Sequence, residues 1–272
     1  MPSFAPRSYL FVPGNRPDRY AKALAAGADA VIVDLEDAVP SSEKTAARAA
    51  LAEWLSPEHP VLIRINGTES QWFREDLPIC RTPGVAGVLL PKAESVEDIQ
   101  VVAEHCDAAT PILALIETAR GFWNAHALAH PKVQRFVFGS IDFQLDLGIQ
   151  GEEDELLYFR SQLVLVSRIA GFEPPVDGVT TAINDAERVR ADTLRARRLG
   201  FGAKLCIHPR QVSVVNECFE PSAEEGSWAK RIVEAADAAH GAAVSVDGKM
   251  VDRPVIARAQ AILAQIKQRG QS

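Results

Sequence analysis

The chain has 272 residues, of which 47% are hydrophobic and 24% are charged. These proportions are ordinary for a soluble globular protein, and the length suits one α/β barrel with an appendage. The net charge of -7 argues against a nucleic-acid surface, because such a surface needs a clustered basic face. A membrane-spanning protein is also excluded, since no apolar run approaches the roughly 20 residues that cross a bilayer.

The first residues and the cysteines together predict a cytoplasmic protein. The N-terminal sequence lacks the apolar core of a signal peptide. The cysteines show no C-x-x-C pair and no disulfide framework, so we interpret them as reduced thiols. They are Cys80, Cys106, Cys206 and Cys218.

Short β-branched runs alternate with amphipathic segments along most of the chain, as in repeated strand–helix units. Eight runs predict strands over 8–12, 30–35, 61–65, 87–90, 111–116, 135–138, 177–180 and 203–207. The segments between and after them predict helices over 17–26, 42–55, 71–80, 95–106, 121–129, 158–170, 185–199 and 211–219. Eight such units close a parallel sheet, so we predict a TIM (β/α)8 barrel over residues 1–220.

Residues 221–272 exceed what a barrel needs. Their pattern predicts a helix over 227–240, a glycine-containing loop or short hairpin over 241–253, and a final helix over 255–267. We expect this helical extension either to pack on the flank of the barrel, or to form a lid or an arm exchanged between subunits.

Polar side chains follow nearly all of the predicted strands. They are Asn15 and Arg16, Asp34, Glu36 and Asp37, Arg64 and Asn66, Lys92, Glu117, Asp142, and His208. The carboxyl ends of the strands form the catalytic face of such a barrel. This convergence of both charge signs therefore indicates an active site.

Two carboxylates stand out. Glu117 directly follows an apolar run, and Asp142 is expected at the end of the neighbouring strand. Adjacent carboxylates repel each other unless a cation lies between them. No Cys or His is expected beside them as a further ligand. The oxygen ligands therefore favour Mg²⁺ over zinc. Two alternatives stay open: Glu117 forms a salt bridge to Arg64 or Lys92, or Asp146 replaces Asp142 as a ligand.

Arg64 projects from the end of the third predicted strand. Its forked guanidinium suits a carboxylate or a developing enolate oxygen. An ion pair with Glu36 or Asp37 explains the residue equally well.

Lys44 and Arg48 lie four residues apart, on one face of the second predicted helix. Together with Arg16 and Arg19 they form a candidate phosphate-binding patch, although a solvated helix face is the more common explanation. The motifs G-x-S-x-G, G-x-x-x-x-G-K-[ST] and G-x-G-x-x-G are absent from the sequence, which argues against the chemistries that they serve.

A series of motifs resembles the citrate lyase β-subunit-like (CitE-like) group of the HpcH/HpaI aldolase/citrate lyase family. The segments are LFVPGNRP at 10–17, VDLEDAV at 33–39, IRIN at 63–66, LPK at 90–92, LIETARG at 115–121, FGSIDF at 138–143, CIHP at 206–209 and GKMVDRP at 248–254. They occur in one order over essentially the whole chain, so the resemblance is specific. One departure is the Ser140-Ile141 pair before Asp142, where relatives more often have a small residue and an acid.

The resemblance implies a barrel, assembled as a homotrimer or hexamer, that makes or breaks a carbon–carbon bond between an acyl-CoA and a 2-keto acid. By matched position, Glu117 and Asp142 would bind Mg²⁺, and Arg64 would contact substrate beside Glu117. Asp252 would enter the site of a neighbouring subunit. Nucleic acid and membrane are not expected partners.

The chemistry implied by the resemblance uses Mg²⁺ as a Lewis acid and template. Loss of the hydroxyl proton from a 3-hydroxyacyl thioester gives the keto acid and a CoA enolate, whose oxygen Arg64 would stabilise. Asp252 would carry the proton at the enolate carbon. Arg16, Lys44 and Arg48 would meet the CoA phosphates.

These expectations define a stand-alone lyase that acts on citramalyl-CoA, malyl-CoA or citryl-CoA. Three alternatives remain: a citrate lyase β subunit that acts on a carrier-bound citryl thioester within a complex, a CoA-independent class II pyruvate aldolase, and a non-catalytic acyl-CoA-binding protein.

Overall fold

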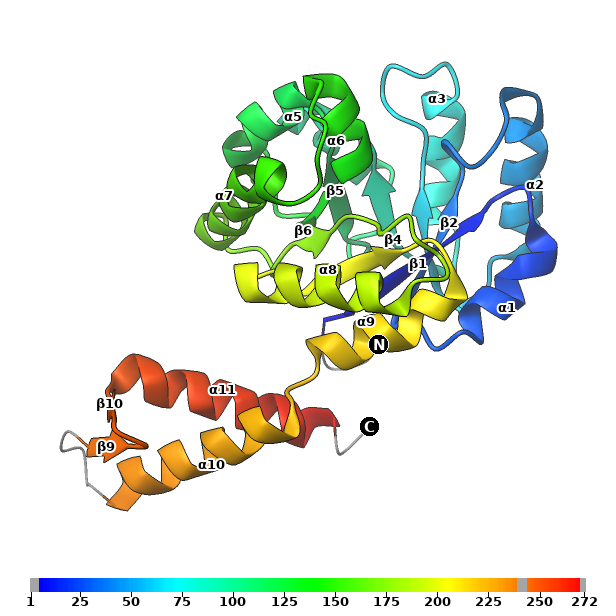
Figure 1. Cartoon of the computed structure of the whole chain (residues 1–272). Helices are drawn as coiled ribbons and strands as arrows, with labels where there is room; N and C mark the ends of the chain where they lie inside the picture. The colour runs from blue at the N-terminus through cyan, green and yellow to red at the C-terminus, as the bar shows by residue number, and fades with distance from the viewer. Residues whose placement is uncertain (1–4, 239–243, 270–272) are drawn as a thin grey trace. The chain divides into compact units, whose positions relative to one another are not determined.

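The computed structural model describes residues 5–238 and 244–269 (Figure 1). Within it, the chain divides into two compact units. One unit is Pro6–Phe219, and the other contains Ala5 and the described residues from Glu220 onward. No helix among the described residues is long and apolar enough to cross a membrane.

The first unit is a closed barrel of eight parallel strands, which confirms the predicted TIM (β/α)8 fold. Each strand pairs with the next along the chain, and β8 pairs with β1. The strands are β1 Ser8–Pro13, β2 Ala30–Asp34, β3 Val61–Arg64, β4 Val85–Leu90, β5 Ile112–Ile116, β6 Val133–Phe138, β7 Val176–Asp177 and β8 Ala203–Cys206.

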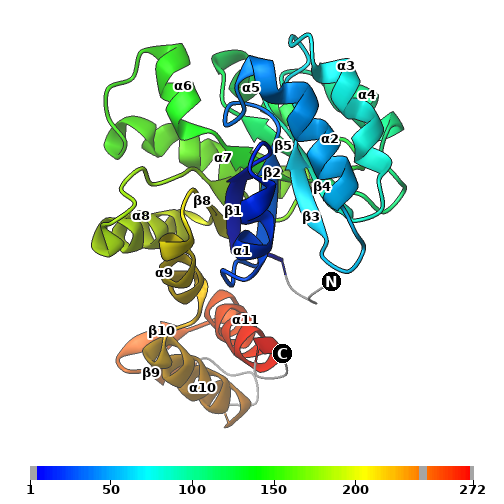
Figure 2. The same cartoon turned by 90° about the vertical axis from the view of Figure 1, so that its right-hand side faces the viewer.

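Helices follow the strands and surround the barrel (Figure 2). They are α1 Tyr20–Leu24, α2 Lys44–Trp54, α3 Phe73–Asp76, α4 Val96–Glu104, α5 Ala119–Asn124, α6 Ser140–Leu147, α7 Leu157–Ile169, α8 Ala186–Leu199 and α9 Pro209–Phe219. Local sequence fixes several of their ends. Ser95 and Asp98 form a capping box at the start of α4, and Gly200 ends α8 with a φ of 104°.

Alternation along the strands separates two apolar layers. Residues such as Tyr9 and Ile32 pack inside the barrel, whereas their neighbours Leu10 and Val31 pack against the helices. The interior also contains the fully buried Arg135, whose guanidinium donates hydrogen bonds to the Tyr9 hydroxyl and to backbone carbonyls that precede β1 and β7. A buried cation with hydrogen-bond partners therefore occupies the interior near the amino ends of the strands.

Two parts of the barrel differ from the sequence prediction. The predicted strand over 177–180 is only two residues long, because the carbonyls after it accept side-chain hydrogen bonds: Gly178 from Lys204 and Thr180 from Gln211. The second difference is helix α6, which lies between the strand predicted over 135–138 and the helix predicted over 158–170, where no helix was predicted.

The C-terminal unit is a helical hairpin with a small sheet. Its elements are α10 Ala223–Ala238, β9 Val244–Val246, β10 Lys249–Val251 and α11 Arg253–Arg269. β9 and β10 pair antiparallel around Asp247-Gly248, which both have positive φ, as the tight turn of a hairpin requires. The predicted hairpin over 241–253 is thus present where the structure describes it, while 239–243 lie outside the described residues.

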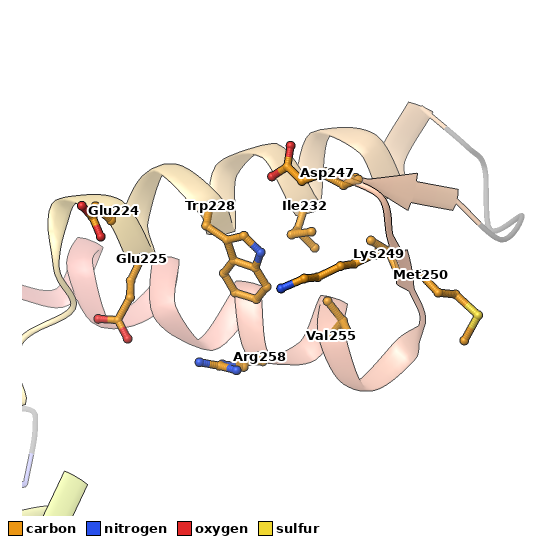
Figure 3. A pocket seen from close by; sticks show the side chains of 11 residues that line it. Glu224, Glu225, Trp228, Ile232, Asp247, Lys249, Met250, Val255 and Arg258 are labelled. Atoms are coloured by element: carbon orange, nitrogen blue, oxygen red, sulfur yellow. The ribbon is translucent and has the colours of Figure 1, made fainter. Parts of the chain in front are cut away.

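A cavity of about 510 Å³ lies within this unit, between the two helices and the hairpin (Figure 3). Trp228 and Ile232 of α10 face it, as does Val255 of α11, and Lys249 reaches across it. The Arg258 guanidinium lies 5.4 Å from the centre of the Trp228 ring. Few side chains are fully buried in this unit, since its core consists of Ala229, Ile232, Val251, Ala259 and Ile262.

Candidate active site

A cavity of about 420 Å³ lies at the carboxyl ends of the barrel strands. Its charged lining includes Arg64, Glu117 and Asp142, and therefore brings together three residues that the sequence predicted to share a site. Asp34 and Asp37 complete the charged side. The apolar lining includes Phe11, Leu115, Phe138, Ile141, Val179, Leu205 and Ile207.

Glu117 directly follows β5, and only 2% of the residue is exposed. Burial raises the pKa of its carboxyl to about 8, and the neighbouring carboxylates of Glu36 and Asp142 add to this effect. The sequence left open an ion pair of Glu117 with Arg64 or the Lys92 ammonium. The structure instead gives its carboxylate a hydrogen bond from a backbone amide. The backbone N–H of Lys92 donates to Oε1 at 2.9 Å. A buried carboxylate that faces two others is a position where a cation would relieve repulsion.

Gly139 gives Glu117 the room that it needs. A Cβ at position 139 would lie 2.5 Å from the Glu117 Cβ and 2.6 Å from its Oε2. Any larger residue would therefore displace the carboxylate from its place beside the start of α6. This close approach lets Glu117 on β5 and Asp142 on α6 line the same cavity.

Asp142 lies at a different place in the fold from the one predicted. The sequence placed it at the end of the sixth strand, but β6 ends at Phe138, and Asp142 lies in the first turn of α6. The chain enters the helix at once after Gly139, so the side chain still reaches the cavity. Asp146, the alternative ligand, is one turn further along α6 and accepts a hydrogen bond from the Ala119 N–H at 2.7 Å. Its carboxylate is thus directed to the start of α5.

Arg64 both lines the cavity and forms ion pairs. Its Nε and Nη2 donate to the two Asp34 oxygens at 2.7 and 2.6 Å, and Nη1 lies 3.1 Å from Glu36 and 3.8 Å from Asp37. Sequence reasoning proposed Glu36 and Asp37 as partners and missed Asp34, which is the bidentate one. The available signal was the position of Asp34 at the end of β2, because parallel pairing places it directly beside Arg64 on β3.

Lys44 lies in the first turn of α2 and is buried. Its Nζ donates to the carbonyls of Leu35 and Glu36 at 2.8 and 2.7 Å, and to the Asn66 side chain at 2.7 Å. An ammonium has three N–H donors, and these contacts use all of them. Lys44 therefore ties the loop after β2 to β3 rather than presenting a free charge.

The other two predicted phosphate contacts are also paired. Arg16 forms a two-bond ion pair with the exposed Asp18, and Arg48 bonds Asp76 at 2.7 Å and Glu75 at 2.9 Å. The structure therefore does not bring Arg16, Lys44 and Arg48 into one open basic patch.

Asp252 belongs to the C-terminal unit, between β10 and α11. The residue is exposed, and its Oδ1 accepts a hydrogen bond from the Val255 N–H at 3.3 Å. It thus caps the first turn of α11. Its predicted entry into the site of a neighbouring subunit stays a prediction.

The donor set of the barrel cavity fits a hard divalent cation. Among the described residues no three His, Cys, Asp or Glu side chains are grouped as a ready-made metal cage. Mg²⁺ does not need such a cage, since it is usually held by one or two carboxylates and takes its other ligands from water and substrate. Glu117 and Asp142 meet this requirement, with Glu36 adding negative charge nearby.

Known proteins are similar to this chain over most of its length. Residues 7–209 match the family model described as HpcH/HpaI aldolase/citrate lyase. The chain is 40% identical to a citrate lyase subunit beta-like protein of Deinococcus radiodurans, over 95% of this chain and 96% of that protein. It is 36% identical to a (3S)-malyl-CoA thioesterase of Cereibacter sphaeroides, with the same coverage of both chains.

Solved structures are similar over the same length. The crystal structure of protein CitE from Mycobacterium tuberculosis, in complex with magnesium, acetoacetate and coenzyme A, superposes with a TM-score of 0.87 at 33% identity. The match covers 98% of this chain and all of that one. A second structure of that protein, with magnesium and pyruvate, gives a TM-score of 0.77.

Proposed function

Because this chain belongs to the HpcH/HpaI aldolase/citrate lyase family, we propose that it is a Mg²⁺-dependent carbon–carbon lyase acting on a 3-hydroxyacyl-CoA. Cleavage would give a 2-keto acid and acetyl-CoA. The observation that carries the proposal is the shared cavity of Arg64, Glu117 and Asp142 at the barrel mouth. The magnesium, keto acid and coenzyme A found with the Mycobacterium tuberculosis protein support the same class of ligands.

Glu117 and Asp142 would hold the metal. When bound, Mg²⁺ supplies a Lewis acid for the keto oxygen and a template that orients the substrate. The protein prepares this position by burying Glu117 and fixing its Oε1 on the Lys92 amide. Gly139 keeps the space around the other oxygen open.

Arg64 would stabilise negative charge on the thioester oxygen as the carbon–carbon bond breaks. Asp34 and Glu36 fix its guanidinium before substrate arrives, so little reorganisation is needed during the reaction. The bonds to Asp34 use two of its five N–H groups, and Glu36 and Asp37 lie close to Nη1.

Asp252 is the proposed proton carrier at the carbon of the leaving enolate, donated by a neighbouring subunit of a trimer or hexamer. Its exposure in the C-terminal unit suits a residue that acts outside its own unit. Apolar side chains on the barrel also support assembly, because Trp123, Leu145 and Tyr158 are between 62% and 82% exposed.

For the CoA phosphates, Arg16 is the preferred of the three proposed cations. Its pair with Asp18 is exposed, so a phosphate would replace it at little cost. Arg48 would have to leave two carboxylates, and Lys44 would lose three hydrogen bonds.

Hydrolysis of the thioester is a second candidate activity, and the similarity to the (3S)-malyl-CoA thioesterase favours testing it. The test incubates the purified protein and Mg²⁺ with citramalyl-CoA, malyl-CoA or citryl-CoA, and identifies the products by mass spectrometry. A lyase releases acetyl-CoA with pyruvate, glyoxylate or oxaloacetate. A thioesterase releases free CoA and the intact hydroxy acid.

Three other outcomes would contradict the proposal. Cleavage only in the presence of citrate lyase partner subunits would indicate the β subunit of a complex. Cleavage of free hydroxy-keto acids, without any CoA thioester being cleaved, would indicate a pyruvate aldolase. Binding without turnover would indicate an acyl-CoA-binding protein.

A further inference from the structure

Lys92 has an unusual backbone for its residue type. It follows β4 after Pro91 and has a φ of 47°, in the left-handed region that a residue with a Cβ seldom adopts. In the described part of the chain, the only other non-glycine residue with positive φ is Asp247, which lies in a hairpin turn where such a conformation is normal. No hairpin explains the conformation of Lys92.

The backbone of Lys92 contacts the proposed metal site directly. Its N–H donates to Glu117 Oε1 at 2.9 Å, and this is the hydrogen bond that fixes that oxygen. The next residue returns to the barrel, since the Ala93 N–H donates to the Leu115 carbonyl at 3.2 Å. The left-handed residue therefore turns one amide toward Glu117 just before the chain rejoins the neighbouring strand.

The side chain of Lys92 reaches a different part of the same site. Its Nζ donates to Glu36 Oε1 at 2.9 Å, and the other oxygen of Glu36 lies 3.1 Å from Arg64 Nη1. The Glu36 side chain is only 8% exposed, so it depends on these two cations for its charge balance. The contacts form a chain from Glu117 through Lys92 and Glu36 to Arg64.

We propose that Lys92 is a positioning residue that couples the metal ligand Glu117 to the substrate-binding Arg64, and this inference rests on the proposed function. The two contacts have separate tasks. The left-handed backbone orients Glu117 for the metal. The ammonium holds Glu36, and through it the guanidinium of Arg64.

The ammonium is tested by Lys92→Met, with Lys92→Arg as the conservative variant and Lys22→Met, an exposed lysine of α1, as the control. Mn²⁺ affinity, measured by electron paramagnetic resonance, reports on the metal site independently of turnover. We expect Lys92→Met to lower kcat about 10- to 100-fold, the usual range for the outer partners of a metal site, with Mn²⁺ affinity close to that of the wild type. Lys92→Arg should recover most of the kcat.

The backbone is tested by Lys92→Val and Lys92→Gly. Valine strongly disfavours the left-handed region, whereas glycine adopts it freely, and both lack the ammonium. We expect Lys92→Val to weaken Mn²⁺ binding about tenfold or more, and Lys92→Gly to bind Mn²⁺ as Lys92→Met does. Lys92→Ala replaces the valine variant if that protein does not fold, as judged by circular dichroism.

The inference would be overturned by wild-type kcat and KM in Lys92→Met, or by equal Mn²⁺ affinity in the valine (or alanine) and glycine variants. Equal loss of kcat in the methionine and arginine variants would also overturn it, since a cation at this position would then be irrelevant. If the wild-type protein cleaves no CoA thioester, the proposed function fails. The Mn²⁺ measurements still decide whether the Lys92 backbone orients Glu117.

Discussion

The barrel mouth and the C-terminal unit hold their charged residues in opposite ways. At the barrel mouth, Glu117 and Arg64 are largely buried, and nearby groups fix both of them at hydrogen-bond distance. In the C-terminal unit, Asp252 is exposed, and the Arg231–Asp247 ion pair is more than half exposed on both sides. Folding therefore holds the barrel charges in one geometry, and their burial costs desolvation free energy. Asp252 remains in contact with solvent and does not carry that cost.

The largest effect is expected from Glu117→Gln, which changes a buried residue at the barrel mouth. The substitution removes a proposed metal ligand, so turnover should fall by about three orders of magnitude, because a catalytic metal supplies several kcal/mol. Isothermal titration with Mg²⁺ should show loss of binding. Asp146→Asn is the control, since the Asp146 carboxylate accepts a hydrogen bond from the Ala119 N–H. Loss of Mg²⁺ binding in this control variant would contradict the assignment of Asp142 as the second ligand.

Asp252→Ala, in the exposed C-terminal unit, should lower kcat by about 10²-fold, the lower end of the usual contribution of a positioned proton carrier. Mg²⁺ affinity should not change, because the proposed metal ligands, Glu117 and Asp142, lie in the barrel. Mixing this variant with Arg64→Ala, followed by subunit exchange, should restore activity through sites that have both residues intact. No recovery in the exchanged mixture would argue against a shared site.

Asp177→Asn tests the cost of burying charge in the barrel wall. Asp177 is fully buried and bonds Arg160 at 2.9 Å and Lys204 at 3.1 Å. Removing its charge leaves two buried cations without a counter-charge, so unfolding in urea at pH 7 should show a loss of about 3–5 kcal/mol. The same substitution at the exposed Asp237 of α10 should change the stability by less than about 0.5 kcal/mol.

The stabilising effect of Asp177 also has a predicted pH dependence. Burial by itself would raise its pKa, but Lys204 and Arg160 lower it below the ordinary 3.8. A group whose folded pKa is depressed stabilises the protein above the unfolded pKa and loses that contribution as the pH falls through the folded value. The difference between wild type and Asp177→Asn should therefore be constant near neutrality and shrink only below pH 3.8. A difference that shrinks near pH 6 would contradict this account.

The smallest effect is expected from the cap that Asp252 provides. Asp252→Ala should cost about 1 kcal/mol in the stability of α11, whereas Asp252→Ser keeps a capping oxygen and should cost less. Both variants should be equally inactive if Asp252 carries a proton. Recovery of turnover in the serine variant would show that the residue acts only as a cap.

The barrel and the central part of the site could be predicted because they depend on regular patterns. Eight alternations predict closure, and closure brings the strand ends that carry Arg64 and Glu117 to one cavity. Helix α6 could not be predicted from its sequence, SIDFQLDL, because its apolar and polar residues alternate and give no helical period. Its Phe143 is fully buried against Phe138 and Phe159, with ring centres 5.3 and 4.8 Å apart. That packing is tertiary and overrides local propensity.

Lys44 shows the same limit of sequence reasoning. The four-residue spacing correctly placed Lys44 and Arg48 on one helix. It could not reveal that the loop after β2 turns the Leu35 and Glu36 carbonyls toward Nζ. Such carbonyl positions depend on the loop backbone, which has no periodic signature.

The pairing of Asp34 with Arg64 has a consequence for changes in chain length. The two residues are direct neighbours across adjacent strands, so their contact depends on sheet register and not on the connection between β2 and β3. Insertions in the loop before α2 should leave the pair in place. A single-residue deletion within β3 would turn Arg64 to the opposite face of the sheet, because side chains alternate with a period of two. The Asp34–Arg64 pair therefore tolerates a change of length in the crossover but not within the strand.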